Sequence, residues 1–451
     1  MITPNGPAIG SHLATGDGRG VDAHLAAAAG AADAWHLPAQ AIIVPHGDAP
    51  GAAAVAATAY AALRGLAGRV GRVVLIGPAH HRRLTGLGVP AGRTLATPLG
   101  AMPLDRATLD ALLALPGTAA LDDEACAGEP AIAAQLPFLQ RVLGPVALVP
   151  LLAGEAGPDL VAEALALAAG DGPGTLVVIS SDLSHGLDDG SARRLDTLTS
   201  GLIETLRGDA LESAMARGYR AIGGMLARGR TLDLRTTALD LRTSADFDGR
   251  RERVVGFGAF ALEDAASACL PEPLRARLQE AVHAALDATV RTGRPPPVTP
   301  EDWPRPLRAC RQTFVTLELD GELRGCIGSS VPVNPLVVDV VENAHKAATC
   351  DPRFPPLTAD ELPRVEATIS ILSTPRAMPC ASETELLGLV EPGRDGLILA
   401  DGPRHGLFLP KVWDLVPDPR LFLAHLKVKA GLPVQHWSDR TTVWRFSAET
   451  F

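Results

Sequence analysis

The chain has 451 residues, of which 47% are hydrophobic and 20% are charged, so it can bury sizeable cores and is not a disordered chain. At roughly 150 residues per domain, this length predicts two or three domains. The formal net charge of −10 argues against a general binder of nucleic acid or of anionic membranes. The sequence shows no apolar run long enough to span a membrane, no secretory pattern and no CxxC pair. We therefore expect a cytoplasmic protein that binds neither nucleic acid nor membranes.

Up to residue 262, short apolar runs alternate with Ala- and Leu-rich stretches of helical character. The apolar runs are 41–45, 72–77, 146–152, 175–181 and 253–262. Helices are expected over 21–34, 51–66, 105–113, 130–143, 159–169 and 191–206. Nearly continuous β-branched runs separated by helices are typical of a buried, mostly parallel sheet with helices on both faces. Residues 1–262 are therefore predicted to form an α/β domain.

The pattern changes after residue 262. Residues 263–273 (EDAASACLPEP) are predicted to be a linker, and an amphipathic helix is expected over 272–292. Further strands are expected at 313–319 and 367–372, and further helices at 336–350 and 419–431. Strands and helices no longer alternate regularly, which favours an α+β domain over residues 274–451.

Polar residues follow three of the predicted strands of the first domain. IIVPHGD ends in His46 and Asp48, VVLIGPAHH in His80 and His81, and VVISSDLSH contains Asp182 and His185. Ligands gather beyond the carboxyl ends of the strands in a parallel α/β sheet, so His46, His80, Asp182 and His185 are expected to converge. They indicate either a metal site or an acid–base pair in which Asp182 orients His185. Taken one at a time, each residue fits an ordinary loop or helix cap equally well.

The motifs IVPH, LIGPAHH, TPLG, QLPFLQ, ISSDLSH and RVVGFGAFAL resemble, in order and spacing, those of the Memo family, also called AmmeMemoRadiSam system protein B. The resemblance covers about residues 41–262. It implies a fold like that of class III non-haem iron extradiol dioxygenases, with His46 and His80 as ligands of iron, copper or zinc. It implies catalytic roles for Asp182 and His185. It also places Ser244 and Asp246, in RTSADFDG, in the pocket, where the family has its SGD stretch.

The chain departs from this family at the pocket. Arg217, in MARGYRAIGG, stands where the family has a metal-binding cysteine, and the family's EHS segment reads Glu129-Pro130-Ala131. An arginine is not a metal ligand, and its charge opposes a bound cation. We expect the Arg217 guanidinium to project toward His46 and His80, which leaves the ligand set incomplete. The alternatives are that Asp48 supplies the third ligand or that Arg217 binds an anion.

Residues 270–451 resemble the AMME-syndrome-candidate domain, AmmeMemoRadiSam system protein A, through LRGCIGS, NAHKAATCDPRFPPLTADEL, ISILSTP, GRDGLIL, HGLFLPKVW and FLAHLKVKAGLP. Cys326 lies next but one to Arg324, so it is either a reactive, substrate-contacting thiol or a small buried side chain. Asp351 and Arg353 lie in the CDPRFPPL loop, and together with Arg324 they are predicted to be at the surface of this domain.

The two resemblances imply a component of an AmmeMemoRadiSam-type system that acts with a radical S-adenosylmethionine (SAM) protein on a protein or peptide substrate. In this interpretation, the first domain performs a metal-dependent oxidoreductase step with an incomplete ligand set, and the second domain presents the substrate. The alternative is a non-catalytic scaffold or binding module with a metal-free Memo-like domain.

Overall fold

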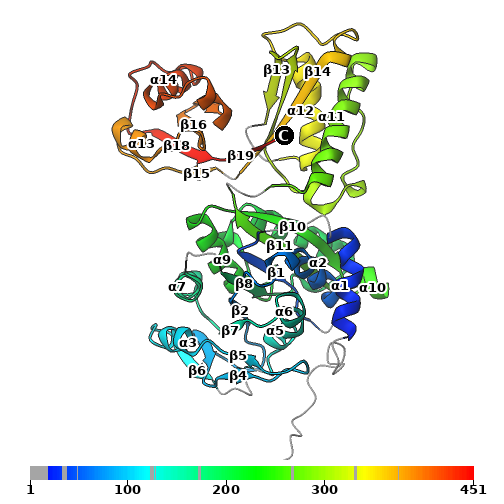
Figure 1. Ribbon diagram of the computed structural model, residues 1–451, viewed down its shortest axis with the longest axis vertical. Helices are drawn as coiled ribbons and strands as arrows, with labels where there is room; N and C mark the ends of the chain where they lie inside the picture. The colour runs from blue at the N-terminus through cyan, green and yellow to red at the C-terminus, as the bar shows by residue number, and fades with distance from the viewer. Residues whose placement is uncertain are drawn as a thin grey trace, which may run out of the picture. The chain divides into compact units, whose positions relative to one another are not determined.

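The computed structural model describes residues 19–32, 38–47, 49–121, 126, 128–170, 174–265, 269–329, 333–373 and 375–451. The chain divides into two compact units, Met1–Asp264 and Ala265–Phe451, and each has its own sheets and helices (Figure 1). Over the residues that the structure describes, no helix is long and apolar enough to cross a membrane.

One large mixed sheet forms the centre of the first unit, with the strand order β10-β11-β1-β8-β2-β7-β3-β6. Its four central strands run parallel: β1 (Ala41–Val44), β8 (Thr175–Ser180), β2 (Arg72–Pro78) and β7 (Ala147–Ala153). They are buried along almost their whole length, which explains why they consist of nearly continuous Val, Leu and Ile. The mostly parallel sheet predicted for the first domain is therefore present.

The two edges of this sheet are partly antiparallel. At one edge, β11 (Val254–Asp264) pairs antiparallel with both β1 and β10 (Leu234–Thr243). At the other, β3 (Leu87–Pro90) is antiparallel to β7 and parallel to β6 (Thr118–Leu121). The shorter strands are β4 (Thr94–Leu95), β5 (Met102–Pro103) and β9 (His185–Leu187).

The helices of the first unit are α1 (Arg19–Ala32), α2 (Ala52–Ala62), α3 (Arg106–Leu113), α5 (Pro130–Ala133), α6 (Leu136–Val142), α7 (Pro158–Ala169), α8 (Asp189–Glu204), α9 (Tyr219–Thr231) and α10 (Ala245–Asp248). The single helix expected over 130–143 is divided into α5 and α6. Pro137 accounts for this break, because it has no backbone N–H to donate to Ala133.

The linker expected over 263–273 is shorter than predicted. Glu263 and Asp264 continue β11 and pair with Arg235 and Leu234, so the sheet includes them. At the other end, α11 already begins at Glu272. Of the residues between, 266–268 lie outside the described part of the chain.

The second unit has two antiparallel sheets. The first has the order β13 (Glu322–Gly328), β12 (Thr313–Leu319), β14 (Val365–Leu372), β19 (Ala448–Thr450). The second has the order β15 (Arg376–Ala377), β18 (Thr441–Phe446), β16 (Gly396–Asp401), β17 (Arg404–Phe408). The helices are α11 (Glu272–Thr292), α12 (Leu336–Thr349), α13 (Glu383–Leu389) and α14 (Pro419–Lys429).

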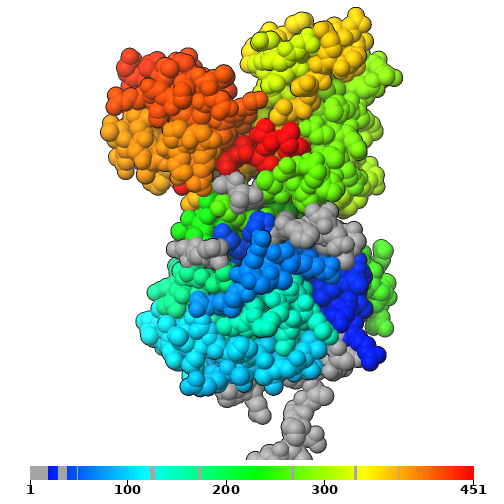
Figure 2. All heavy atoms as spheres, in the orientation of Figure 1, coloured from blue at the N-terminus to red at the C-terminus, as the bar shows by residue number. Residues whose placement is uncertain are grey.

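The last residues of the chain complete the first of these sheets. β19 pairs with β14, and the Gln279 side chain in α11 donates a hydrogen bond to the Phe451 carbonyl at 3.1 Å. Figure 2 shows this C-terminal segment, in red, against the green α11. Residues 448–451 are thus part of the first sheet of the second unit.

Candidate functional site

The carboxyl ends of β1 and β2 bring His46 and His80 face to face. Both strands flank β8, so the loops that follow the three strands open at the same edge of the sheet. The two Nε2 atoms lie 3.3 Å apart, and the rings meet at 71°. His46 is only 4% exposed, whereas the His80 side chain is 26% exposed. His80 is therefore the ring of this pair that a ligand reaches first.

Glu129 determines the protonation of His80. Its Oε1 lies 2.6 Å from Nδ1 of His80, and its Oε2 accepts the backbone N–H of His80 at 2.9 Å. Burial raises the pKa of Glu129, but the hydrogen bonds from His80 outweigh this effect and lower the pKa overall. The ionised carboxylate holds a proton on Nδ1, so Nε2 of His80 is an acceptor.

A second set of hydrogen bonds determines the protonation of His46. Gln135 Oε1 accepts from the Tyr60 hydroxyl at 3.0 Å, and its Nε2 donates to the Pro45 carbonyl at 2.9 Å and to Ser180 Oγ at 3.0 Å. The Pro45 carbonyl only accepts, which fixes the orientation of the amide. Ser180 Oγ lies 3.1 Å from Nδ1 of His46, and because it already accepts from Gln135 we assign it as the donor in this contact. This places the His46 proton on Nε2, facing His80.

The hydrogen bonds of the site therefore run in one direction and end at a carboxylate. The chain of donors and acceptors is Tyr60, Gln135, Ser180, His46, His80 and Glu129. This chain of hydrogen bonds assigns one ring proton to each histidine from its hydrogen-bond partners. Burial also lowers the pKa of His46, and the nearby charge of Asp182 does not reverse this effect.

Asp182 anchors the loop that carries His46. Its Oδ1 accepts the backbone N–H groups of His46 and Gly47 at 3.0 and 3.2 Å, and its Oδ2 lies 3.6 Å from Nε2 of His185. Burial by itself raises the pKa of Asp182, but the interactions with His46 and His185 outweigh it and lower the pKa to about 2. The Leu183 carbonyl, 2.9 Å from Nδ1 of His185, orients the His185 imidazole. The four residues predicted to converge thus lie together.

The spacing of His46 and His80 matches a shared metal ion, but a third ligand is absent among the described residues. Two nitrogens bound at ~2.0–2.1 Å to a tetrahedral ion lie about 3.3–3.4 Å apart. Ligation requires a lone pair on both Nε2 atoms, so it would require the His46 proton on Nδ1, with Ser180 Oγ as its acceptor. Within the described ranges, no group of three His, Cys, Asp or Glu side chains is placed to hold an ion, although mononuclear sites use three or more protein ligands. The described residues therefore do not form a complete ligand set.

Arg217 approaches this site through its backbone and not through its side chain. Its N–H donates to the Asp182 carbonyl at 3.1 Å. The side chain is exposed and lines a neighbouring cavity, without a contact to His46 or His80. The expected projection of the guanidinium toward the two histidines is therefore absent from the structure.

The other residues expected in the pocket make contacts elsewhere. His81 contacts Glu129 through its backbone N–H at 3.4 Å, and its side chain is exposed. Asp246 forms an ion pair with Arg193 at 2.6 Å, and Ser244 Oγ accepts the Val255 N–H. These bonds stabilise the turn between β10 and β11. Asp48 lies outside the described residues.

In the second unit, Arg324 is buried rather than at the surface. It is 8% exposed because its guanidinium binds the Glu361 carboxylate at 2.8 and 3.1 Å and the Pro355 carbonyl at 2.9 Å. These bonds occupy the guanidinium, so Arg324 is not the cation that acts on the Cys326 thiol.

Asp351 is likewise buried, at 4% exposure, because its carboxylate accepts the Cys326 N–H at 2.8 Å and pairs with Arg353 at 2.6 Å. Only the Arg353 side chain, 54% exposed, is at the surface as predicted. The partly buried Cys326 thiol accepts a hydrogen bond from Thr316 at 3.3 Å. A reactive role for Cys326 stays a prediction.

The sequence interpretation missed Glu129, Ser180 and Gln135 as members of the site. Glu129 was considered only as part of a segment that lacks a histidine. One available signal was a carboxylate directly before Pro130, at the start of a helix. A second was the polar Gln135 inside the apolar stretch QLPFLQ. A buried amide without a local partner usually serves a longer-range hydrogen bond.

Comparison with known proteins places the chain in two families. The Memo-like protein family matches residues 27–261, and the AMMECR1 family matches residues 278–451. A protein of Methanothermobacter thermautotrophicus is 42% identical over 156 residues, which cover 34% of this chain and 80% of the relative. Protein MJ0810 of Methanocaldococcus jannaschii is 40% identical over 159 residues, covering 34% of this chain and 77% of the relative.

Among solved structures, the uncharacterized protein PH0010 of Pyrococcus horikoshii is 33% identical, with a TM-score of 0.37, over 40% of this chain and 90% of that chain. The uncharacterized protein JW3007 of Escherichia coli is 14% identical, with a TM-score of 0.35, over 49% of this chain and 98% of that chain. The chain therefore belongs to the Memo-like family through residues 27–261 and joins to it an AMMECR1 domain over residues 278–451.

Proposed function

We propose that the first unit binds a substrate at the His46–His80 pair and transfers protons there, as part of an AmmeMemoRadiSam-type system. The observation that carries this proposal is the Glu129–His80 contact of 2.6 Å. A carboxylate on Nδ1 with an unprotonated Nε2 on the more exposed ring is the arrangement of a general base. The fold expected of a Memo domain, which is like that of extradiol dioxygenases, is consistent with ligand binding at this edge of the sheet.

In the proposed mechanism, a hydroxyl or acidic C–H group of the substrate displaces His46 as the donor to Nε2 of His80. His80 accepts the proton, and the ionised Glu129 stabilises the resulting imidazolium. The Nε2–H of His46 then donates to the substrate atom that gains negative charge. Asp182 stays ionised and holds the His46 loop through its two backbone hydrogen bonds.

The system assignment rests on the joining of the two domain families in one chain. Linking two modules raises their effective concentration to about the mM range, which is useful when both act on one target. In this proposal, the second unit presents a protein or peptide substrate, and a radical SAM protein is the partner.

Anaerobic calorimetric titration of the full chain with Fe²⁺ and with Zn²⁺ separates proton transfer from metal chemistry. We expect weak binding that is the same in the native chain, His46→Gln and His80→Gln. Tight binding of one ion per chain that both substitutions abolish would overturn the proton-transfer proposal and identify a metal site.

Sedimentation velocity with a purified radical SAM protein of the same organism tests the partner. We expect a complex with the full chain. If the two proteins sediment independently, with and without S-adenosylmethionine, the system assignment fails. The chain is then a binding module for another target.

A further inference from the structure

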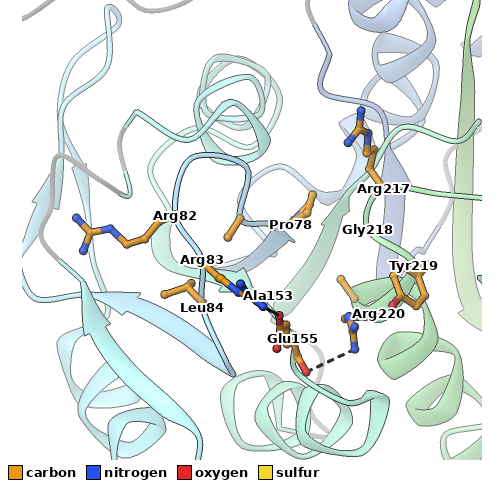
Figure 3. Close-up of a pocket in the computed structure, with 13 residues that line it drawn as sticks. Pro78, Arg82, Arg83, Leu84, Ala153, Glu155, Arg217, Gly218, Tyr219 and Arg220 are labelled. Atoms are coloured by element: carbon orange, nitrogen blue, oxygen red, sulfur yellow. Dashed lines mark hydrogen bonds and ion pairs between the residues drawn. The ribbon is translucent and has the colours of Figure 1, made fainter. Parts of the chain in front are cut away.

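A cavity of about 240 Å³ lies one strand further along the edge of the sheet that carries the histidine pair (Figure 3). Its lining includes Pro78 and Ala79, which directly precede His80, and Ala153 and Gly154, at the end of β7. The cavity and the histidine pair therefore share the loop that follows β2.

Four arginines line this cavity: Arg82, Arg83, Arg217 and Arg220. Glu155 is the one carboxylate among the described residues of its lining. Figure 3 shows Arg83 and Arg220 turned toward Glu155, with Arg82 and Arg217 at opposite sides. In a chain of formal net charge −10, four guanidinium groups gathered in one described lining make this surface locally basic.

Two of these arginines are held in place by contacts inside the cavity lining. Arg83 pairs with Glu155 at 3.2 Å. Arg220 donates to the Glu155 carbonyl at 3.4 Å, and its guanidinium lies 5.0 Å from the centre of the Tyr219 ring. In contrast, the Arg217 guanidinium makes no hydrogen bond or ion pair with a residue in the described part of the chain, so its donors are available to a ligand.

The N-terminus of α9 adds backbone donors to the same cavity. This helix of 13 residues begins at Tyr219, and its N-cap, Gly218, supplies no side-chain acceptor. The N–H groups of Arg220 and Ala221, both in the lining, bond to no backbone carbonyl among the described residues. Unpaired amides at the positive end of a helix favour an anion.

We propose that this cavity binds a doubly charged oxyanion group of a small substrate, the chemistry of a phosphate monoester, and thereby directs the reacting end of that substrate toward His80. Guanidinium groups match phosphate oxygens in bidentate geometry. A dianion compensates more of the excess positive charge than a single carboxylate does. The inference rests on the proposed function only for the placement of the reacting end, not for binding of the anion.

Calorimetric titration of the full chain with inorganic phosphate at low ionic strength tests the anion site. We expect saturable binding to the native chain. Arg217→Gln and Arg82→Gln should each weaken it by about tenfold, as expected for loss of one charge-assisted pair. The control is Arg69→Gln, which removes an exposed arginine before β2, at the opposite end of that strand, and should change the affinity less than twofold. Succinate should bind more weakly than phosphate.

Three results would overturn the inference. They are no saturable phosphate binding, a loss of phosphate affinity in Arg69→Gln equal to that in Arg217→Gln, or tighter binding of succinate than of phosphate. Circular dichroism melting of each variant excludes loss of binding through unfolding. His80→Gln should leave phosphate affinity unchanged, because the arginines are intact. If the metal titration finds a tight site, the proton-transfer proposal is overturned, but the phosphate affinity of the arginines is unaffected. The two proposals therefore fail separately.

Discussion

At the scale of single residues, Asp196 is a buried carboxyl group close to the loop of His185. It is 1% exposed; its Oδ1 accepts the Ser184 N–H at 3.0 Å, and its Oδ2 has no hydrogen-bond partner among the described residues. Burial raises its pKa to about 6, despite the hydrogen bond from Ser184. The folded pKa lies above the unfolded value, so the group stabilises the fold at low pH and this contribution is lost as pH rises from about 4 through 6.

Asp196→Asn is therefore expected to raise the free energy of unfolding by about 2–3 kcal/mol at about pH 8 and to have little effect at about pH 4. Urea unfolding at both pH values measures this difference. The control is Asp110→Asn, at a side chain that is 64% exposed, which should change little at either pH. An equal gain for Asp196→Asn at both pH values would show that ionisation of this group is not the cause.

Lys427 is a fully buried cation in α14. Its Nζ pairs with Glu383 at 2.6 Å and donates to the Val434 carbonyl at 3.0 Å. Lys427→Ala should lower the free energy of unfolding by about 2–4 kcal/mol, because it leaves a cavity and removes the partner of both oxygens. Lys346→Ala, in an exposed pair with Glu342, is the control and should cost less than about 1 kcal/mol. Similar losses in the two variants would contradict the structural role of Lys427.

At this scale, the positions of site residues that follow strands could be predicted from the sequence, whereas the directions of side chains in loops could not. His46, His80 and Asp182 follow adjacent strands, so their proximity follows from the order of the sheet. Arg217 lies in a loop, and no local sequence pattern encodes the direction of its exposed side chain. The contact between Glu129 and His80 likewise joins residues 49 positions apart.

At the scale of elements, the packing of α9 against α7 sets one side of the arginine-lined cavity. Gly224 lies at their contact, where an added Cβ would be 2.4 Å from Cγ1 of Val161 and 3.0 Å from the Pro158 carbonyl oxygen. A valine side chain and a backbone carbonyl have little freedom to move aside. The two helices can approach this closely only because position 224 has no side chain.

Gly224→Ala is therefore expected to lower the free energy of unfolding by about 1–2 kcal/mol, since overpacking exceeds the gain of about 1 kcal/mol in helix propensity. The matched control is Gly201→Ala in α8, where an added Cβ meets nothing within 4 Å. It should stabilise the chain by about 0.5–1 kcal/mol. Chemical unfolding of both variants checks the sign, and stabilisation by Gly224→Ala would contradict the packing described.

Elements with a continuous apolar pattern could be predicted closely from the sequence, whereas edge elements could not. The strand over 313–319 and the helix over 272–292 match β12 and α11. β10 was not predicted, because its sequence LRTTALDLRT mixes charged and apolar residues and takes its pairing from β11. Tertiary pairing of this kind outweighs local propensity in antiparallel edge strands.

At the scale of the whole molecule, the two units should fold independently. Among the described residues, each sheet takes all its strands from one unit, with no exchange across residue 264. Limited proteolysis should cut within residues 265–271 and leave two fragments that each unfold cooperatively. Mass spectrometry and thermal melts of the fragments measure this. If either fragment lacks a melting transition of its own, the two units are not independent domains.

The central claim concerns the protons on His46 and His80, and ¹⁵N NMR of the chain labelled at its 12 histidines tests it most directly. His46→Gln and His80→Gln assign the two signals. The account predicts that His46 is protonated on Nε2 and His80 on Nδ1 near neutral pH, following the roles assigned to Ser180 and Glu129. A proton on Nδ1 of both rings, with both Nε2 atoms free to ligate, would contradict it.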